Sequence, residues 1–190
     1  AGAWYNPSGA QTGEIYDTSA NTFDATGNLN QSRANPIVIA TNDGGAVVVG
    51  GWPTYGGSIY TNVEYYRANT NDYVVQSTQI IPSDSGWLLS PIYSRPITDS
   101  RMNDGRYLLL ASRSNPASEF ALLVFNPETK LFSKFATNKP LKDAFTDGGF
   151  FDLVLDNTHN LAYVMGVDSG YIPQRLCLLT VNLANGNVYH

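Results

Sequence analysis

The sequence predicts an all-β fold in which short antiparallel strands are joined by tight turns. Its composition is the first indication: 12% of the 190 residues are aromatic, 14% are charged, and there are 17 glycines and 10 prolines. Many short strands separated by turns have this profile, whereas helices would need charged outer faces. The second indication is a hairpin pattern that recurs along the chain, and the third is the absence of a helical 3.6-residue periodicity.

Four segments carry the same hairpin pattern. In each, an apolar anchor residue lies seven residues before a second anchor, with turn-forming residues between them. The four anchor pairs are Tyr16 and Phe23, Tyr66 and Tyr73, Phe125 and Phe132, and Val181 and Val188. The first anchors of successive pairs are 50, 59 and 56 residues apart. This spacing predicts one structural unit that occurs about four times.

A second pattern precedes three of these hairpins. Apolar runs ending in a small residue follow polar turns, and another apolar strand stands before each turn. The runs are 46–50, 107–111 and 162–166, and the earlier strands are 37–39, a weaker one around Ile97, and 150–155. Continuous apolar runs favour strands buried on both faces. A complete unit is therefore expected to hold four strands, a to d, which at this period matches a β-propeller blade.

One unit carries a more specific set of residues. Arg33, the run 46–51 with its double glycine, Tyr66 and Tyr73 follow one another in the chain. This arrangement resembles a kelch repeat, whose marks are a double glycine after strand b, a tyrosine on strand c and an aromatic residue on strand d. The later units are degenerate, because Ala111 or Gly166 replaces the double glycine. Glycine lets the backbone bend and approach its neighbours closely.

The expected architecture is a partial β-propeller of about three and a half four-stranded antiparallel kelch-like blades, forming one segment over residues 1–190. A half blade (1–29) is followed by blades at 30–78, 79–136 and 137–190. Strands a and b of the first unit are expected to lie outside this segment, since Ala1-Gly2-Ala3 aligns with the end of a strand b. An open fan exposes strand edges and apolar faces. We therefore expect the remainder of a longer propeller, or a completing chain, as a partner.

Binding residues are expected on the b–c and d–a connections, which are long and aromatic, and not on the short a–b and c–d turns. The ligand-binding candidates are Trp4, Tyr5, Trp52, Tyr55, Trp87, Tyr93, Arg95 and Tyr171. Exposed aromatic rings flanked by small polar residues suit sugars or protein partners. The alternative is that these rings pack inward beneath the loops. Arg33 and Arg95, at equivalent positions before strand a, either hydrogen-bond backbone carbonyls of the neighbouring blade or line the central channel for an anionic ligand.

Other classes of function have little support in the sequence. The 11 lysines and arginines are scattered in a chain of net charge −5, which argues against nucleic-acid binding. No apolar stretch approaches the length of a membrane span. His159 and His190 give no metal-ligand spacing, so no metal, cofactor or catalytic residue is assigned. Low charge favours a secreted or periplasmic location, and Asn30-Gln31-Ser32 forms one glycosylation sequon.

Two functions are compatible with this reading, and a purely structural role is a third option. The first is a non-catalytic recognition module that binds a protein or carbohydrate through the b–c and d–a loops. The second is a part of an extracellular carbohydrate-active or galactose-oxidase-like enzyme whose catalytic residues lie outside this segment. Resemblance to the copper oxidases implies a Tyr–Cys crosslink and Tyr/His copper ligands. Cys177 lies in a strand c run without an accompanying histidine.

Overall fold

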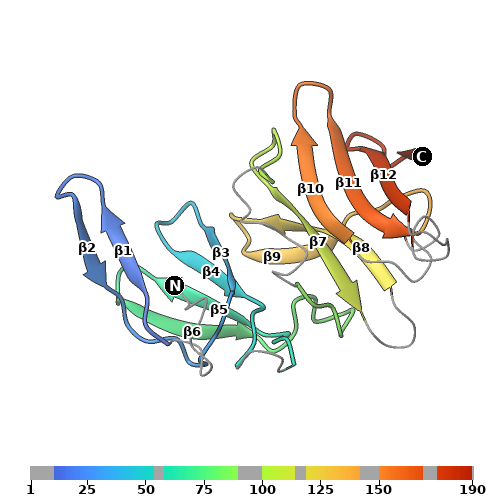
Figure 1. Cartoon of the computed structure of the whole chain (residues 1–190). Helices are drawn as coiled ribbons and strands as arrows, with labels where there is room; N and C mark the ends of the chain where they lie inside the picture. The colour runs from blue at the N-terminus through green and yellow to red at the C-terminus, as the bar shows by residue number, and fades with distance from the viewer. Residues whose placement is uncertain are drawn as a thin grey trace. The chain divides into compact units, whose positions relative to one another are not determined.

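The structure is all-β. The computed structural model describes residues 11–53, 58–89, 100–113, 119–141, 150–168 and 175–189. Over these residues the regular elements are thirteen β-strands in four antiparallel sheets of two to four strands (Figure 1). None of these residues belongs to an α-helix. The prediction of an all-β fold is therefore confirmed.

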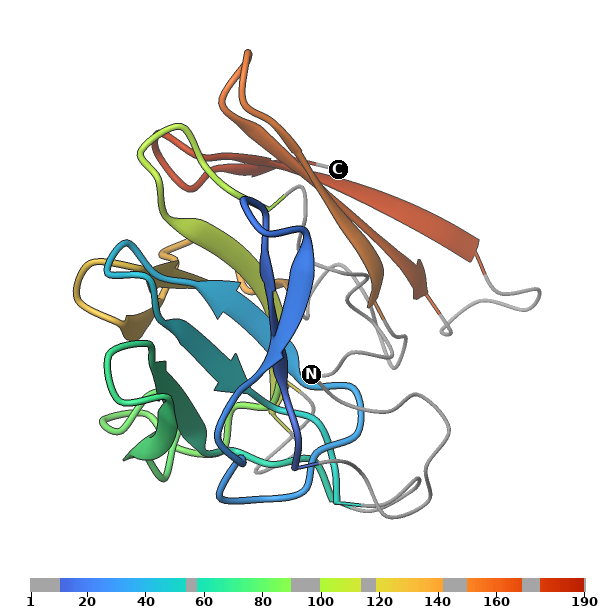
Figure 2. The same cartoon turned by 90° about the vertical axis from the view of Figure 1, so that its left-hand side faces the viewer.

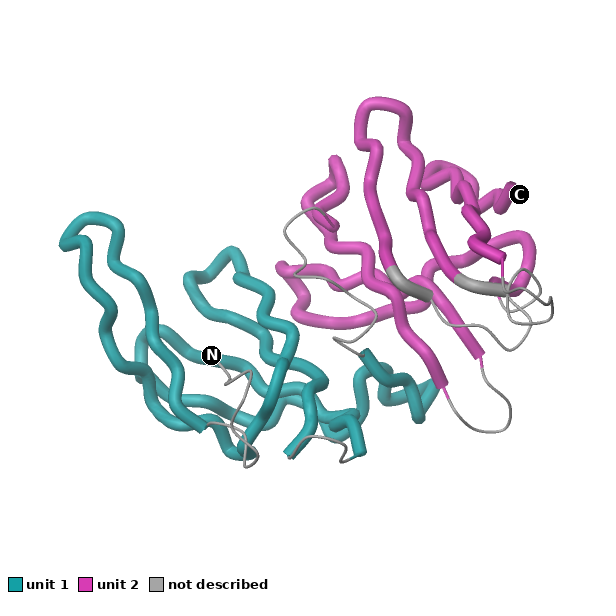
Figure 3. The backbone as a smooth tube through the Cα atoms, in the orientation of Figure 1, with its two compact units in different colours: residues 1–91 teal, residues 92–190 magenta. Residues whose placement is uncertain are grey.

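The chain divides into two compact units, Ala1–Pro91 and Ile92–His190 (Figure 3). The division falls inside the segment 79–136, which the sequence pattern assigned to one blade. The weak strand expected around Ile97 lies outside the described residues. Each unit holds two of the four sheets.

Unit 1 contains a two-stranded hairpin and a four-stranded meander, which can be followed in Figures 1 and 2. Its strands are β1 (Glu14–Asp17), β2 (Thr22–Ala25), β3 (Ile37–Ala40), β4 (Ala46–Val49), β5 (Val63–Arg67) and β6 (Asp72–Ser77). In the meander each strand pairs with its neighbour in the sequence, as expected for strands a to d. Val47, Val48 and Val49 of β4 are all buried, which confirms that this continuous apolar run is covered on both faces.

Unit 2 contains a three-stranded and a four-stranded meander. Its strands are β7 (Tyr107–Arg113), β8 (Glu119–Asn126), β9 (Leu131–Lys134), β10 (Phe150–Asp156), β11 (Leu161–Asp168), β12 (Arg175–Asn182) and β13 (Val188–Tyr189). The order in each sheet again follows the sequence. The predicted strands b, c and d of the third unit and all four strands of the fourth are therefore confirmed.

The core of unit 2 lies between its two sheets. One face of β7–β9 contributes Leu108, Leu110, Leu122 and Val124, and one face of β10–β13 contributes Ala162, Val164, Leu179, Val181 and Val188. The second face includes the anchor pair Val181 and Val188, which oppose each other across β12 and β13. In this unit, therefore, the anchor face of one sheet packs on the non-anchor face of the sheet before it.

All four predicted hairpins share one geometry. The two anchors oppose each other in every case, as in the pairs Tyr16–Phe23 and Phe125–Phe132. The residue five positions after the first anchor has a positive φ of 53° to 71°; these residues are Asn21, Asn71, Lys130 and Gly186. Glycine and asparagine adopt this left-handed conformation most readily. The prediction of four equivalent hairpins is confirmed by this shared register and turn.

Side chains in the turns stabilise the hairpins locally. Asp17, Asn126 and Asn182 directly follow the first anchors, and each accepts hydrogen bonds from the backbone N–H groups two and three residues further on. In the second hairpin the equivalent residue is Arg67, which pairs with Asp72 instead. These contacts lie within six residues of sequence, so they follow directly from the local sequence.

Successive repeats are joined in the same way in both units. The segment that follows strand d contacts the c–d turn of the next repeat: Gly27 N donates to Asn71 O at 3.0 Å, and Asn138 N donates to Gly186 O at 3.0 Å. A Cβ atom on Gly27 would lie 2.3 Å from Asn71 O, and one on Gly186 would lie 2.1 Å from Ala136 O. Both glycines are therefore required by the close approach of one repeat to the next.

Candidate functional site

The most buried polar centre of unit 1 is an ion pair between Arg33 and Glu64. Both side chains are fully buried. Arg33 Nε and Nη2 donate to Glu64 Oε1 at 3.0 and 2.9 Å. Glu64 lies on β5, and Arg33 lies in the connection that leads into β3. Because a buried charge is costly unless it is paired and hydrogen-bonded, the remaining contacts of both groups decide what this centre does.

Both side chains form further hydrogen bonds with other groups of the protein. Arg33 also donates to Gly50 O at 2.6 Å and to Asn62 Oδ1 at 2.7 Å. Glu64 Oε2 accepts from the backbone N and side-chain Nδ2 of Asn30 at 2.6 and 3.0 Å. Burial lowers the pKa of the Arg33 guanidinium, while its hydrogen bond with Glu64 acts in the opposite direction. Of the two roles considered for Arg33, the structure supports the structural one, with the bound carbonyl belonging to its own repeat.

Steric constraints require glycine at both positions of the double glycine, Gly50 and Gly51. Gly50 and Gly51 have φ values of +68° and +74°, which disfavour other residues. A Cβ atom on Gly50 would lie 2.5 Å from Leu89 O, and one on Gly51 would lie 2.6 Å from Ala34 O. The expectation that glycine is needed for close backbone approach is confirmed at these two positions.

Two of the predicted ligand-binding residues are buried. Trp52 is 4% exposed and forms an isolated β-bridge with Ala34, and Trp87 is completely buried with its Nε1 donating to Asp84 Oδ2 at 2.8 Å. The aromatic-surface hypothesis required exposed rings at both positions. For these two tryptophans the structure instead shows the inward packing that was the alternative, because each ring fills the interior beneath a connection.

The other candidates lie outside the described residues: Trp4, Tyr5, Tyr55, Tyr93, Arg95 and Tyr171. Their assignment stays a prediction. Their positions in the sequence are nevertheless informative, because Tyr55 and Tyr171 belong to the b–c connections of the two four-stranded sheets.

The two ends of these sheets differ in the length of their connections. In the meander β10–β13, the a–b and c–d turns comprise residues 157–160 and 183–187, and the b–c connection comprises 169–174. In the meander β3–β6, the turns comprise 41–45 and 68–71, and the b–c connection comprises 50–62. Since the strands are antiparallel, both short turns of a sheet lie at one end and the longer connection lies at the other.

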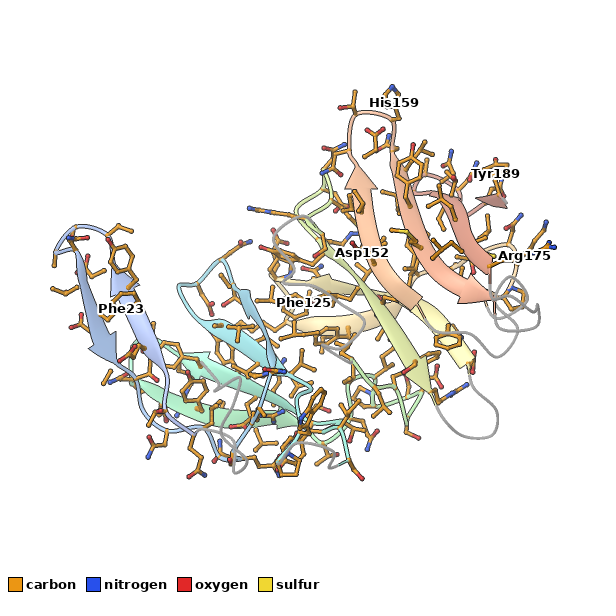
Figure 4. All side chains as sticks on the ribbon, viewed as in Figure 1. Phe23, Phe125, Asp152, His159, Arg175 and Tyr189 are labelled. Atoms are coloured by element: carbon orange, nitrogen blue, oxygen red, sulfur yellow. The ribbon has the colours of Figure 1, made fainter. Side chains whose placement is uncertain are left out.

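Asp17, Asp156 and the described histidine form local contacts in or beside hairpin turns. Asp17 caps a turn, and the hydrogen bonds with Ser19 and Ala20 lower its pKa. His159 lies at the tip of the β10–β11 turn, where it is 70% exposed and 2.7 Å from Asp156 (Figure 4). His159 is therefore a solvated turn residue. Cys177 is partly buried. Across the described part of the chain, no group of three or more His, Cys, Asp or Glu residues could hold a metal ion.

Sequence reasoning missed an exposed apolar face on the sheet β10–β13. The sequence predicted burial on both faces for the runs 150–155 and 162–166 of this sheet, whereas Val154 and Met165 are 48% and 38% exposed. On the adjoining strand β12, Leu176 and Leu178 are 74% and 55% exposed. Their neighbours on the same face include Val154, Met165 and Tyr189, which are also exposed. The first hairpin likewise exposes its anchors Tyr16 and Phe23. No sequence signal distinguishes these positions from their buried equivalents in other repeats, because burial depends on which sheet covers them.

Comparison with known proteins leaves the family open: no protein-family model matches this chain, and no curated protein matches it. In the described residues, no helix is both long and apolar enough to cross a membrane.

Proposed function

We propose that this chain is part of a kelch-like β-propeller and acts as a non-catalytic recognition module for a protein or carbohydrate. Four hairpins with one register and one turn geometry support a repeated unit, and two sheets have the four-stranded meander order of a propeller blade. The Arg33, Gly50-Gly51 and Glu64 cluster holds the best-matching repeat together.

The observation that carries the proposed function is the difference between the two ends of the four-stranded sheets. Short turns stabilised by their own side chains close one end, whereas the other end carries the longer b–c connections. Loops on a rigid scaffold are where binding residues concentrate. Trp52 and Trp87 are buried, so the proposed contact residues are the remaining candidates, Trp4, Tyr5, Tyr55, Tyr93, Arg95 and Tyr171.

A glycan array probed with the chain tests the carbohydrate version. Binding that is weakened by Tyr55→Ala or Tyr171→Ala, and unchanged by His159→Ala at the short-turn end, would support the proposal. Replacing an aromatic ring that stacks on the ligand typically costs about 1–3 kcal/mol, or roughly fivefold to 150-fold in affinity. A blank array would point to a protein partner instead.

An oxidation assay tests the enzymatic alternative. The complete protein that contains this chain is supplied with divalent copper and then with galactose or glyoxal, and hydrogen peroxide is measured. Turnover that exceeds the copper-only control would contradict a purely non-catalytic module. Since His159 is solvated and its partner Asp156 is the last residue of the adjoining strand β10, His159→Ala serves here too as a variant that should change nothing.

A further inference from the structure

Two long connections of unit 1 lie against each other beside the buried ion pair. The first joins β2 to β3 (residues 26–36), and the second joins β4 to β5 (residues 50–62). In the notation of strands a to d they are a d–a and a b–c connection, the two types to which the proposed function assigns binding. The described parts of the second connection are its two ends, 50–53 and 58–62, and these ends form its base.

Arg33, which belongs to the d–a connection, closes the base of the b–c connection. Its Nη1 atom donates to Gly50 O at 2.6 Å, at the start of the b–c connection, and its Nη2 atom donates to Asn62 Oδ1 at 2.7 Å, at the end. Tyr60 N donates to Gly51 O at 2.8 Å across the same base. The centroid of the Tyr60 ring lies 5.0 Å from the guanidinium carbon, within the range of a cation–π contact. The two ends of the b–c connection are therefore held close together.

Further hydrogen bonds fix both ends of the b–c connection to the d–a connection. Near the start, Ala34 N donates to Trp52 O at 2.8 Å, and Trp52 N donates to Ala34 O at 3.1 Å. At the end, Asn62 Nδ2 donates to Gln31 Oε1 at 2.8 Å. The Asn62 amide thus accepts from Arg33 through its oxygen and donates to Gln31 through its nitrogen, so that one side chain joins both connections.

Glu64 fixes the direction in which Arg33 donates. Its Oε1 atom accepts from Nε and Nη2 of the guanidinium, and its Oε2 atom accepts from the backbone N and Nδ2 of Asn30 in the d–a connection. A guanidinium is planar and holds its donors in a fixed fork, so this pairing directs Nη1 to Gly50 O and lets Nη2 reach Asn62. The buried ion pair therefore orients the arginine that joins the two connections.

We propose that Arg33 and Asn62 are positioning residues, which hold the b–c connection on the d–a connection so that the two form one preorganised surface. The inference rests on the proposed function in naming this surface as a place of binding, but the contacts that carry it involve no ligand. A connection that is already ordered loses less conformational freedom when a ligand binds, so less binding free energy is lost. Hydrogen bonds from a charged group suit this role because they are roughly twice as strong as neutral ones.

Hydrogen exchange of the ligand-free chain tests the proposal. Asn62→Ala removes an acceptor from Arg33 and the donor to Gln31, and it keeps the Arg33–Glu64 pair. The Tyr60 amide should then exchange at least roughly tenfold faster, since a lost hydrogen bond to a charged group is large enough for this change. The paired amides of β4 and β5 should change much less, because only the base of the connection opens. An unchanged Tyr60 amide would overturn the proposal, and so would an equal acceleration throughout the sheet, which indicates a purely stabilising role.

Two further variants separate local loosening from a general loss of stability. Gly44→Ala strains the a–b turn, where the φ value is +80° and nothing lies within 4 Å of the added Cβ. It should accelerate exchange across the sheet without singling out the Tyr60 amide. Gln31→Ala removes a neutral hydrogen bond and keeps the one between Arg33 and Asn62, so it should accelerate Tyr60 less than Asn62→Ala does. An effect of Gln31→Ala as large as that of Asn62→Ala would contradict the role given to Arg33.

The glycan array distinguishes this inference from the proposed function. Where a glycan binds the wild-type chain, Asn62→Ala should weaken that binding, although Asn62 is not among the proposed contact residues. Undiminished binding by Asn62→Ala would overturn the positioning role. A blank array combined with faster exchange of the Tyr60 amide in Asn62→Ala would contradict the carbohydrate version of the proposed function and would support the positioning role, because the exchange measurement involves no ligand.

Discussion

Arg33 and Glu64 form an ion pair with both side chains fully buried, and Arg33 Nη2 lies 2.9 Å from Glu64 Oε1. The pair joins the segment before β3 to the third strand of the same meander, and its outer contacts reach Gly50 and Asn30. Such a centre contributes to stability only while every member is present, because a single removal leaves a buried charge without compensation.

Glu64→Ala is expected to lower the free energy of unfolding by about 3–5 kcal/mol, because it leaves the Arg33 guanidinium buried without its counter-charge. Urea denaturation followed by tryptophan fluorescence measures this in unit 1, since Trp4, Trp52 and Trp87 all lie in residues 1–91. The control is the double variant Arg33→Met/Glu64→Leu, which removes both charges. Its loss should be smaller than the sum of the losses measured for Arg33→Met and for Glu64→Leu separately; simple additivity would rule out coupling.

Gly50→Ala is expected to destabilise unit 1 more than Gly44→Ala does. Both glycines have positive φ, +68° and +80°, so both substitutions carry the backbone strain of about 1–2 kcal/mol. Gly44 has nothing within 4 Å of its added Cβ, whereas Gly50 would place that atom 2.5 Å from Leu89 O. The difference between the two losses in urea denaturation isolates the steric part. Equal losses of unfolding free energy would show that the backbone near Leu89 shifts at little cost to make room for the added Cβ.

Lys130→Gly is expected to stabilise unit 2 by about 0.5–1 kcal/mol. Lys130 has a φ of +59° in the β8–β9 turn, where the other three hairpins use asparagine or glycine. Glycine relieves most of the left-handed strain but loses more entropy on folding, so the net gain is modest. Thermal unfolding followed by circular dichroism measures the change. Gly186→Ala, at the equivalent position, should instead destabilise, since its Cβ would collide with Ala136 O.

The Asp72 carboxyl is expected to titrate far below its ordinary range. A hydrogen bond from Arg67, followed by one from Thr70, lowers the pKa of Asp72 from 3.8 to about 2. A depressed acid pKa in the folded state adds stability that is present above pH 4 and is lost as the pH falls towards 2. Carbon-13 NMR titration of the carboxyl follows this directly. Arg67→Met should raise the midpoint towards 3.8; an unchanged midpoint would remove Arg67 as the cause.

Asn30 is expected to remain unmodified in the folded protein despite its sequon. Its Nδ2 group donates to Glu64 Oε2 and to Tyr73 O, both at 3.0 Å. A glycan on Nδ2 would replace one of the two hydrogens that make these bonds. Intact-mass measurement of the folded chain after secretion from a glycosylating host tests this. A native fraction that carries a glycan at Asn30 would contradict the expectation.

The sequence by itself determined the local features of this protein. The spacing of anchors such as Tyr66 and Tyr73 predicted four hairpins, and the structure pairs every one of them in register. Most of the left-handed positions hold asparagine or glycine, and most first anchors are followed by Asp or Asn. A few residues are therefore enough to predict each turn. These features are local because each hydrogen bond joins residues that are close in the chain.

Only the tertiary structure decided which side chains are covered. Trp52 and Trp87 have the sequence context of exposed loop aromatics, yet both rings are buried. Leu122 and Leu178 occupy equivalent positions on equivalent strands, yet the first is 0% and the second 55% exposed. The physical reason is that a side chain is buried by the surface that packs against it. That surface comes from a segment far away in the sequence, or from another molecule. The residues adjacent in the sequence therefore do not indicate whether it is present.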